Sequence, residues 1–286
     1  MKGGAYCYGA ATIINGIATG FGAAFGIGLR TVATVELTDR PKKLDISIIG
    51  DEAENPQLAA ICVTMVLSKF GLSNKYGAKI STKSGIPISR GLSSSSAAAN
   101  AIVLATFSAL NKEYSDMEVI NIGIEASLAA GVTLTGAFDD ACATYFGDVV
   151  VTDNRTRMIL AEYEIEEDYD VLIHVPEIKI RKEDVDTEKL HAIKQILTDA
   201  HCLARNGDYL SALRINGSAY CEAMGLDSSI AERAMDAGAA TAGISGTGPA
   251  TVVLVEKKRK RAVMRAMGDK KRIITTSLNK RTARPL

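Results

Sequence analysis

Apolar and polar positions alternate along some segments of the chain and recur every three to four residues along others. Alternation with period two predicts strands, and the longer spacing predicts helices. The predicted strands are 30–37, 44–50, 77–87, 147–154, 169–176, 250–256 and 271–278. The predicted helices are 56–71, 94–110, 115–131, 188–206, 208–224, 228–238 and 257–268. Ser115, followed three residues later by Glu118, forms a capping-box pattern at the start of the third helix.

The order of these elements predicts an α+β protein with two lobes. Strands and helices follow one another without the regular cadence of a barrel. A chain of 286 residues is long enough for one large domain or two modest ones. We expect an N-terminal domain over residues 1–160 and a C-terminal domain over residues 161–286.

The first 28 residues contain eight glycines between alanine, isoleucine and phenylalanine. This stretch is too apolar for a linker. It predicts close backbone packing or turns around a ligand.

Composition and charge exclude several classes of protein. No apolar run reaches the ~18 residues of a membrane span, and the first residues are not typical of a signal peptide, so we expect a cytoplasmic protein without a membrane partner. The five cysteines show no C-x-x-C spacing and the three histidines form no cluster, which disfavours a disulfide framework or a zinc site. The net charge is zero, but residues 256–286 hold 12 lysines and arginines against two acids. Without a recognition motif, this basic segment favours a solvated helix face, and we expect no nucleic-acid partner.

Candidate chemistry begins at the sequence GLSSSSAAANAIV, residues 91–103. A helix N-terminus presents unpaired backbone N–H groups and a partial positive charge, and a preceding glycine lets a ligand approach them. Serine hydroxyls add donors and can bind Mg²⁺. The segment is therefore a candidate phosphate cradle. A serine cap before a buried alanine-rich helix explains it equally well.

The wider segment PISRGLSSSSAAA, residues 87–99, resembles the second motif of the GHMP kinases, a superfamily of small-molecule kinases. Pro87, Gly91, Leu92, Ser94 and Ser95 match its pattern, whereas Ser93 replaces the usual glycine and Ser96 the first alanine. GISGTGPA, residues 243–250, resembles the third motif, and GAFDDACATYFG, residues 136–147, resembles the stretch with the catalytic aspartate. Ala10 stands where many members have a lysine.

The resemblance implies the two-lobed GHMP kinase fold, with the active site between the lobes and with ATP and Mg²⁺ bound there. It assigns ATP binding to Pro87, Ile88, Ser89, Arg90, Gly91, Leu92, Ser93, Ser94, Ser95, Ser96, Ala97, Gly246 and Gly248. Ser95 and Glu125 are the candidate Mg²⁺ ligands. Asp139 is the candidate catalytic base, and Thr12, Asn15, Thr135 and Asp139 are candidates for binding the acceptor. We expect Asp140 to cap the following helix.

TIINGIATG, SSSSAAANA and TGAFDDACATYFG together resemble a narrower branch, the archaeal-type shikimate kinases. This implies ATP-dependent phosphorylation of the 3-hydroxyl of shikimate, a step toward chorismate and the aromatic amino acids, by a monomer or homodimer. The alternatives are a homoserine kinase, disfavoured by Asp139 and Asp140, and a mevalonate kinase, disfavoured by the missing lysine. A catalytically silent member that binds a metabolite also stays open.

Overall fold

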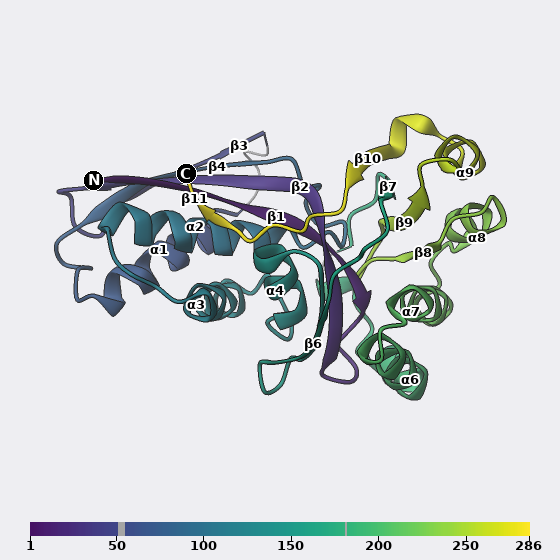
Figure 1. The fold of residues 1–286 in the computed structure, drawn as a ribbon. Coiled ribbons are helices and arrows are strands. Elements are labelled where there is room, and N and C mark those ends of the chain that lie inside the picture. Colours follow the sequence, from purple (N-terminus) through teal and green to yellow (C-terminus); the bar gives the residue numbers. More distant parts are fainter. Residues whose placement is uncertain (51–54, 181) are drawn as a thin grey trace.

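The computed structural model describes residues 1–50, 55–180 and 182–286. Its elements form two sheets with helices packed against them (Figure 1). The strands of the first sheet are β1 (Lys2–Ile14), β2 (Phe21–Thr38), β3 (Leu44–Ile49), β4 (Gly77–Ser84), β5 (Val149–Asp153), β6 (Met158–Tyr163) and β11 (Arg284–Pro285). They follow the order β11-β1-β2-β4-β3, and β5 pairs with both β2 and β6. The β3–β4 pair is parallel and the other pairs are antiparallel.

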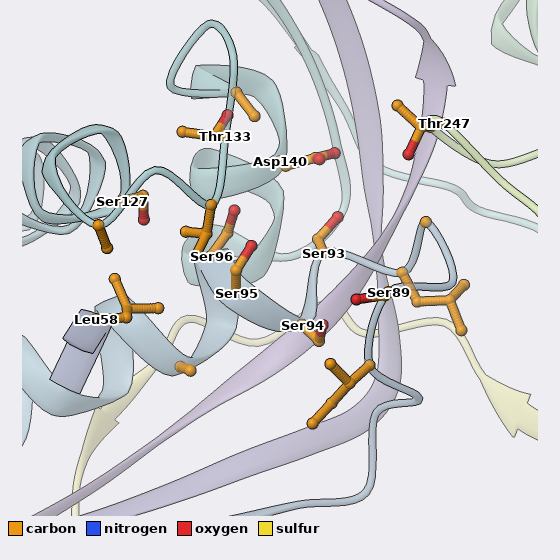
Figure 2. A pocket seen from close by; sticks show the side chains of 18 of the residues that line it. Leu58, Ser89, Ser93, Ser94, Ser95, Ser96, Ser127, Thr133, Asp140 and Thr247 are labelled. Atoms are coloured by element: carbon orange, nitrogen blue, oxygen red, sulfur yellow. The ribbon is translucent and has the colours of Figure 1, made fainter. Parts of the chain in front are cut away.

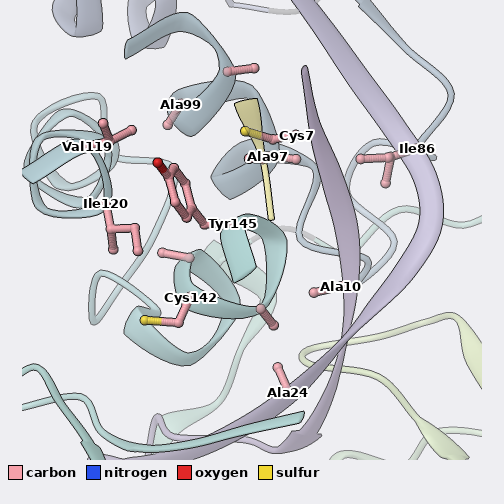
Figure 3. Packing of buried hydrophobic residues seen from close by; sticks show 14 of the residues in the cluster. Cys7, Ala10, Ala24, Ile86, Ala97, Ala99, Val119, Ile120, Cys142 and Tyr145 are labelled. Atoms are coloured by element: carbon pink, nitrogen blue, oxygen red, sulfur yellow. The ribbon is translucent and has the colours of Figure 1, made fainter. Parts of the chain in front are cut away.

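Helices cover one face of this sheet (Figure 1). They are α1 (Gln57–Lys69), α2 (Ser94–Leu110), α3 (Asp116–Ala129) and α4 (Phe138–Phe146). Helix α2 is buried along most of its length because its alanines allow close packing against β1 and β2. Figure 3 shows this core, where Ala97 and Ala99 of α2 lie near Val119 and Ile120 of α3 and Tyr145 of α4.

The second sheet consists of β7 (Tyr169–His174), β8 (Thr241–Ile244), β9 (Thr251–Glu256) and β10 (Ile273–Ser277). Its strands are antiparallel in the order β10-β7-β9-β8. The accompanying helices are α5 (Thr187–Ala192), α6 (Lys194–Arg205), α7 (Tyr209–Met224), α8 (Ser229–Asp236) and α9 (Lys260–Met267), with short 3₁₀ turns η1 (Lys182–Asp184) and η2 (Lys270–Arg272). The largest core cluster includes residues of both sheets, and β11 returns the C-terminus to β1. The division near residue 160 stays a prediction.

Most predicted elements are confirmed, and the differences have local causes. The glycine-rich first 28 residues form β1 and the start of β2, because small side chains let α2 and α4 pack closely on these strands. The short strands β6 and β8 escape detection, and the predicted helix 188–206 is interrupted at Ile193. The cap at Ser115 is confirmed, since its Oγ accepts the N–H of Glu118 at 3.2 Å. The Glu118 side chain pairs with Lys69 instead of closing the box.

The basic segment near the C-terminus forms a surface helix, as predicted. Helix α9 buries Val263 and Met267 against the second sheet and turns its charged residues outward. Several cations of this region pair with local acids, for example Lys260 with Asp170 at 3.0 Å. In the described parts of the chain, no helix is long and apolar enough to cross a membrane.

Candidate active site

A cavity of about 450 Å³ lies where the N-termini of α2 and α4 meet the end of β1 and the glycine-rich loop 245–248 (Figure 2). It brings together most of the residues singled out from the sequence. Those that line it are Thr12, Asn15, Ile88, Ser89, Gly91, Leu92, Ser93, Ser94, Ser95, Ser96, Thr135, Asp139 and Gly246. Segments from the two halves of the chain therefore share one pocket.

The first turn of α2 faces this cavity. The first backbone bond of the helix runs from the N–H of Ala97 to the carbonyl of Ser93 at 3.0 Å. The N–H groups ahead of Ala97 therefore have no intrahelical acceptor, and they can bind an anion. Ser93 precedes the helix in the left-handed region (φ 56°, ψ 33°), a conformation that is strained for any residue other than glycine.

The loop before α2 is held by Ser245, which is fully buried. The Ser245 hydroxyl accepts the backbone N–H of Thr12 at 2.9 Å and donates to the carbonyl of Gly91 at 2.6 Å. Gly91 has φ +76°, and a Cβ at this position would lie 2.1 Å from the Ser245 carbonyl oxygen. Only glycine fits this contact, so β1, the serine-rich loop and the glycine-rich loop are fixed relative to one another.

The turn after β1 is also tied to the second half of the chain. Asn216 of α7 accepts the backbone N–H of Asn15 at 3.0 Å. The Asn15 amide donates to the carbonyl of Gly246 at 3.1 Å and accepts the N–H of Ile17 at 3.0 Å. Asn15 thus orders one wall of the cavity, and its own amide is already engaged by the protein.

Asp139 lies in the first turn of α4 and is only 3% exposed. The Asn154 amide donates to its Oδ1 at 2.8 Å, and Asn154 Oδ1 accepts the Asp139 backbone N–H at 3.1 Å. Gly22 of β2 leaves room for the carboxyl group, because a Cβ there would lie 2.5 Å from Asp139 Cγ. Burial raises the pKa of Asp139 and the neighbouring Asp140 charge raises it further, while the Asn154 hydrogen bond opposes the shift.

Asp140 points into the cavity, which differs from the expectation that it caps α4. The helix begins at Phe138 and has no side-chain cap. Asp140 Oδ1 instead accepts the Thr12 hydroxyl at 2.9 Å. Burial raises the pKa of Asp140, and hydrogen bonds from Thr12 and Ser93 oppose that rise. No lysine or arginine is among the described residues that line the cavity, so the two neighbouring carboxyl groups have no cationic side chain within it.

Five residues singled out from the sequence do not line the cavity. Glu125 is 52% exposed and pairs with Arg157 at 2.6 Å. Arg90 turns away and donates to the carbonyl of Glu177 at 2.7 Å. The remaining three are Pro87, Ala97 and Gly248. Thr135 does line the cavity, but its hydroxyl accepts the backbone N–H of Ala137 at 3.3 Å, as a turn-capping residue does.

Sequence reasoning missed several residues that shape the site. Ser245 lies within the third motif but was not selected, and it acts through Thr12, 233 positions away; Asn154 was not selected either, and it acts through Asp139, 15 positions earlier. Thr247 lines the cavity from the glycine-rich loop, where only the glycines had been selected. The neighbouring acids Asp139 and Asp140 did indicate a functional site from the sequence. Two carboxyl groups beside apolar residues are costly to bury unless a hydrogen-bond partner or a positive charge compensates them.

Comparisons with known proteins agree on the kind of protein that has this site. The family model described as GHMP kinases N terminal domain matches residues 57–148. The shikimate kinase of Methanothrix thermoacetophila is 44% identical over 99% of this chain and 96% of its own length. The shikimate kinase of Methanosarcina mazei is 41% identical over 98% of this chain and 95% of its own length.

Solved structures share the fold at low sequence identity. A homoserine kinase from Cytophaga hutchinsonii has a TM-score of 0.77 at 16% identity, covering 100% of this chain and 97% of the other. The mevalonate kinase of Methanococcus jannaschii has a TM-score of 0.77 at 15% identity, covering 96% of this chain and 98% of the other. These two structural similarities establish the fold. They do not identify the acceptor substrate, which depends on the sequence relatives and on the site.

Proposed function

The chain belongs to the shikimate kinase family within the GHMP kinases, and from this premise we propose that it transfers the γ-phosphoryl group of ATP to the 3-hydroxyl of shikimate. The products are shikimate 3-phosphate and ADP. The observation that carries the proposal is a single cavity in which an open helix N-terminus with serines faces the buried carboxyl group of Asp139.

The phosphate groups of ATP fit the N-terminus of α2. The free N–H groups of its first turn and the backbone of the loop at Gly91 offer donors without requiring a lysine. Gly246 and Thr247 line the same cavity, with Gly246 beside Gly91, and their backbone would offer further contacts to the phosphates. Phosphoryl transfer needs positioning and charge neutralisation above all, and this arrangement supplies the positioning.

The acceptor fits the end of the cavity formed by Thr12, Asn15 and Asp139. Asp139 would accept the proton of the attacking hydroxyl while the oxygen forms its new bond to phosphorus and the bond to the ADP oxygen breaks. The Asn154 amide holds the carboxyl group in place, and Thr152 fixes that amide by donating to Asn154 Oδ1 at 2.7 Å. The raised pKa of Asp139 suits a group that must take up a proton.

A divalent cation fits this site because its donors are hydroxyl and carboxyl oxygens, the ligands that Mg²⁺ prefers. When bound, Mg²⁺ would neutralise phosphate charge during transfer. The sequence proposes Ser95 and Glu125 as its protein ligands, and Ser95 lies on the cavity wall. A monomeric or homodimeric state, a cytoplasmic location and the lack of a nucleic-acid partner stay predictions.

An ADP-release assay with shikimate, homoserine and mevalonate, each with ATP and Mg²⁺, tests the proposal. We expect shikimate alone to stimulate ADP release and its 3-phosphate to accumulate in equal amount. Stimulation by homoserine or mevalonate instead would assign another acceptor. Tight ATP binding without turnover on any of the three alcohols would favour a metabolite-binding protein.

A further inference from the structure

The structure limits which carboxyl groups of the chain could bind the metal ion of the proposed reaction. Glu125 is paired with Arg157 and lies outside the cavity. The part of α3 that reaches the cavity presents Ser127 and no acid. Among the described residues, the acids that line the cavity are Asp139, Asp140 and Glu183.

These three acids are not equivalent. Asp139 is enclosed by its paired hydrogen bonds with Asn154 and lies against Gly22 of β2. Glu183 belongs to the turn η1, and its exposed side chain comes from the second half of the chain. Asp140 lines the cavity near the N-terminus of α2, where the Ser93 side chain is close enough to lower the Asp140 pKa, while the Ser93 hydroxyl itself donates to the carbonyl of Ala10 at 3.3 Å.

Ser95 offers a second oxygen atom that could bind the metal ion. In Figure 2 the hydroxyls of Ser93 and Ser95 point to the side of the pocket from which Asp140 projects. Within the described chain, the Ser95 hydroxyl makes no hydrogen bond and caps no helix, so it stays available to a ligand. The Thr12 hydroxyl of β1 holds the Asp140 carboxyl group at 2.9 Å, and the Ser93 side chain lies beside it. The strained backbone of Ser93 is consistent with a functional need for its hydroxyl, because glycine would relieve the strain but remove that group.

Resting on the proposed kinase function, we propose that Asp140 and Ser95 are the protein ligands of Mg²⁺, with the Thr12 hydroxyl holding the Asp140 carboxyl group in place. One carboxylate and one hydroxyl together with phosphate oxygens form a ligand set that Mg²⁺ accepts. The ion also supplies the positive charge that the described lining of the cavity lacks beside Asp139 and Asp140.

Binding of Mn²⁺ in the presence of ADP tests this without any turnover. Free Mn²⁺ is counted by electron paramagnetic resonance for the wild type, Asp140→Asn and the matched control Glu125→Gln. We expect Asp140→Asn to weaken Mn²⁺ binding by at least about tenfold, because a charged ligand is lost, and Glu125→Gln to change it less than about twofold. Equal affinity of Asp140→Asn and wild type overturns the inference, and so does a large loss confined to Glu125→Gln.

A change of metal preference separates direct ligation from a general effect on folding. Asp140→Cys replaces the carboxylate with a thiolate, which favours Cd²⁺ over Mn²⁺. We expect the ratio of Cd²⁺ to Mn²⁺ affinity in the presence of ADP to rise at least about tenfold over that of the wild type, which carries the same native cysteines. An unchanged ratio in a variant that still binds ADP overturns the inference. The proposed function fails separately, if wild-type protein releases no ADP with shikimate, whatever these metal titrations give.

Discussion

At the scale of single residues, the reaction depends on the carboxyl group of Asp139, which is buried against Asn154. Asp139→Asn keeps the shape of the side chain and removes its capacity to take up the acceptor proton. We expect kcat to fall by about 10²–10⁴, with the KM for ATP nearly unchanged. Steady-state kinetics with varied ATP and shikimate measures both. A kcat within threefold of the wild type would exclude Asp139 as the base.

The same carboxyl group affects stability in metal-free protein. Burial and the Asp140 charge raise the pKa of Asp139 in the folded state above the ordinary aspartate pKa of about 3.9. At pH values between these two pKa values, the folded state therefore holds more protons than the unfolded state. The free energy of unfolding therefore falls as pH rises through this window. We expect the stability of Asp139→Asn, measured relative to wild type by urea unfolding in a chelator, to increase from pH 4 to pH 8. A constant difference would show that the pKa is not raised.

Single residues also show which parts of the site a sequence can reveal. Ser95 and Asp139 lie within local motifs, and both line the cavity. The orientation of Asp140 depends on Thr12, which is 128 positions away, so the sequence suggested a helix cap instead. Glu125 fits a ligand role by residue type, but its partner Arg157 lies on a different element and becomes visible only in the fold.

At the scale of elements, the spacing between β2 and α4 sets the position of the catalytic carboxyl group. Gly22→Ala would place a Cβ 2.5 Å from Asp139 Cγ, which is closer than any tolerated contact. We expect the variant to lose at least about 10²-fold in kcat, the lower end of what displacing the base from its position can remove. Gly85→Ala is the control, since its nearest contact would be an ordinary 3.7 Å to the Arg30 carbonyl. Unaltered kinetics of Gly22→Ala would show that the strand can yield.

The glycines of the first 28 residues illustrate the limit of sequence analysis for elements. Their abundance correctly predicted close backbone packing. It also concealed β1 and the first part of β2, because glycine is unfavourable in strands unless another element approaches closely. The approaching elements, α2 and α4, are distant in sequence, so the pattern alone could not separate a strand from a ligand-binding turn.

At the scale of the whole molecule, the two halves of the chain are joined at the site by polar contacts as well as by the core. Ser245 contacts Thr12 and Gly91, and Asn216 contacts Asn15. The order of the predicted elements suggested two lobes, and the resemblance to the GHMP kinases implied a site between them. The sequence could not predict these contacts, since Ser245 and Thr12 are separated by 233 positions.

Ser245→Ala tests whether this junction positions both substrates. Removing the hydroxyl leaves the buried N–H of Thr12 without an acceptor and releases the Gly91 carbonyl, which costs about 1–3 kcal/mol of stability. Because the released segments carry the acceptor wall and the phosphate loop, we expect the KM for shikimate and the KM for ATP to rise together. Thr106→Val is the control, since the buried Thr106 hydroxyl donates to the Ile102 carbonyl within α2 and touches neither of the released segments among the described hydrogen bonds. Calorimetry and two-substrate kinetics on both variants distinguish the outcomes. If Ser245→Ala loses stability while both KM values stay unchanged, Ser245 serves the fold alone. If both KM values rise in Ser245→Ala and not in Thr106→Val, the contact between the lobes sets the geometry of the site.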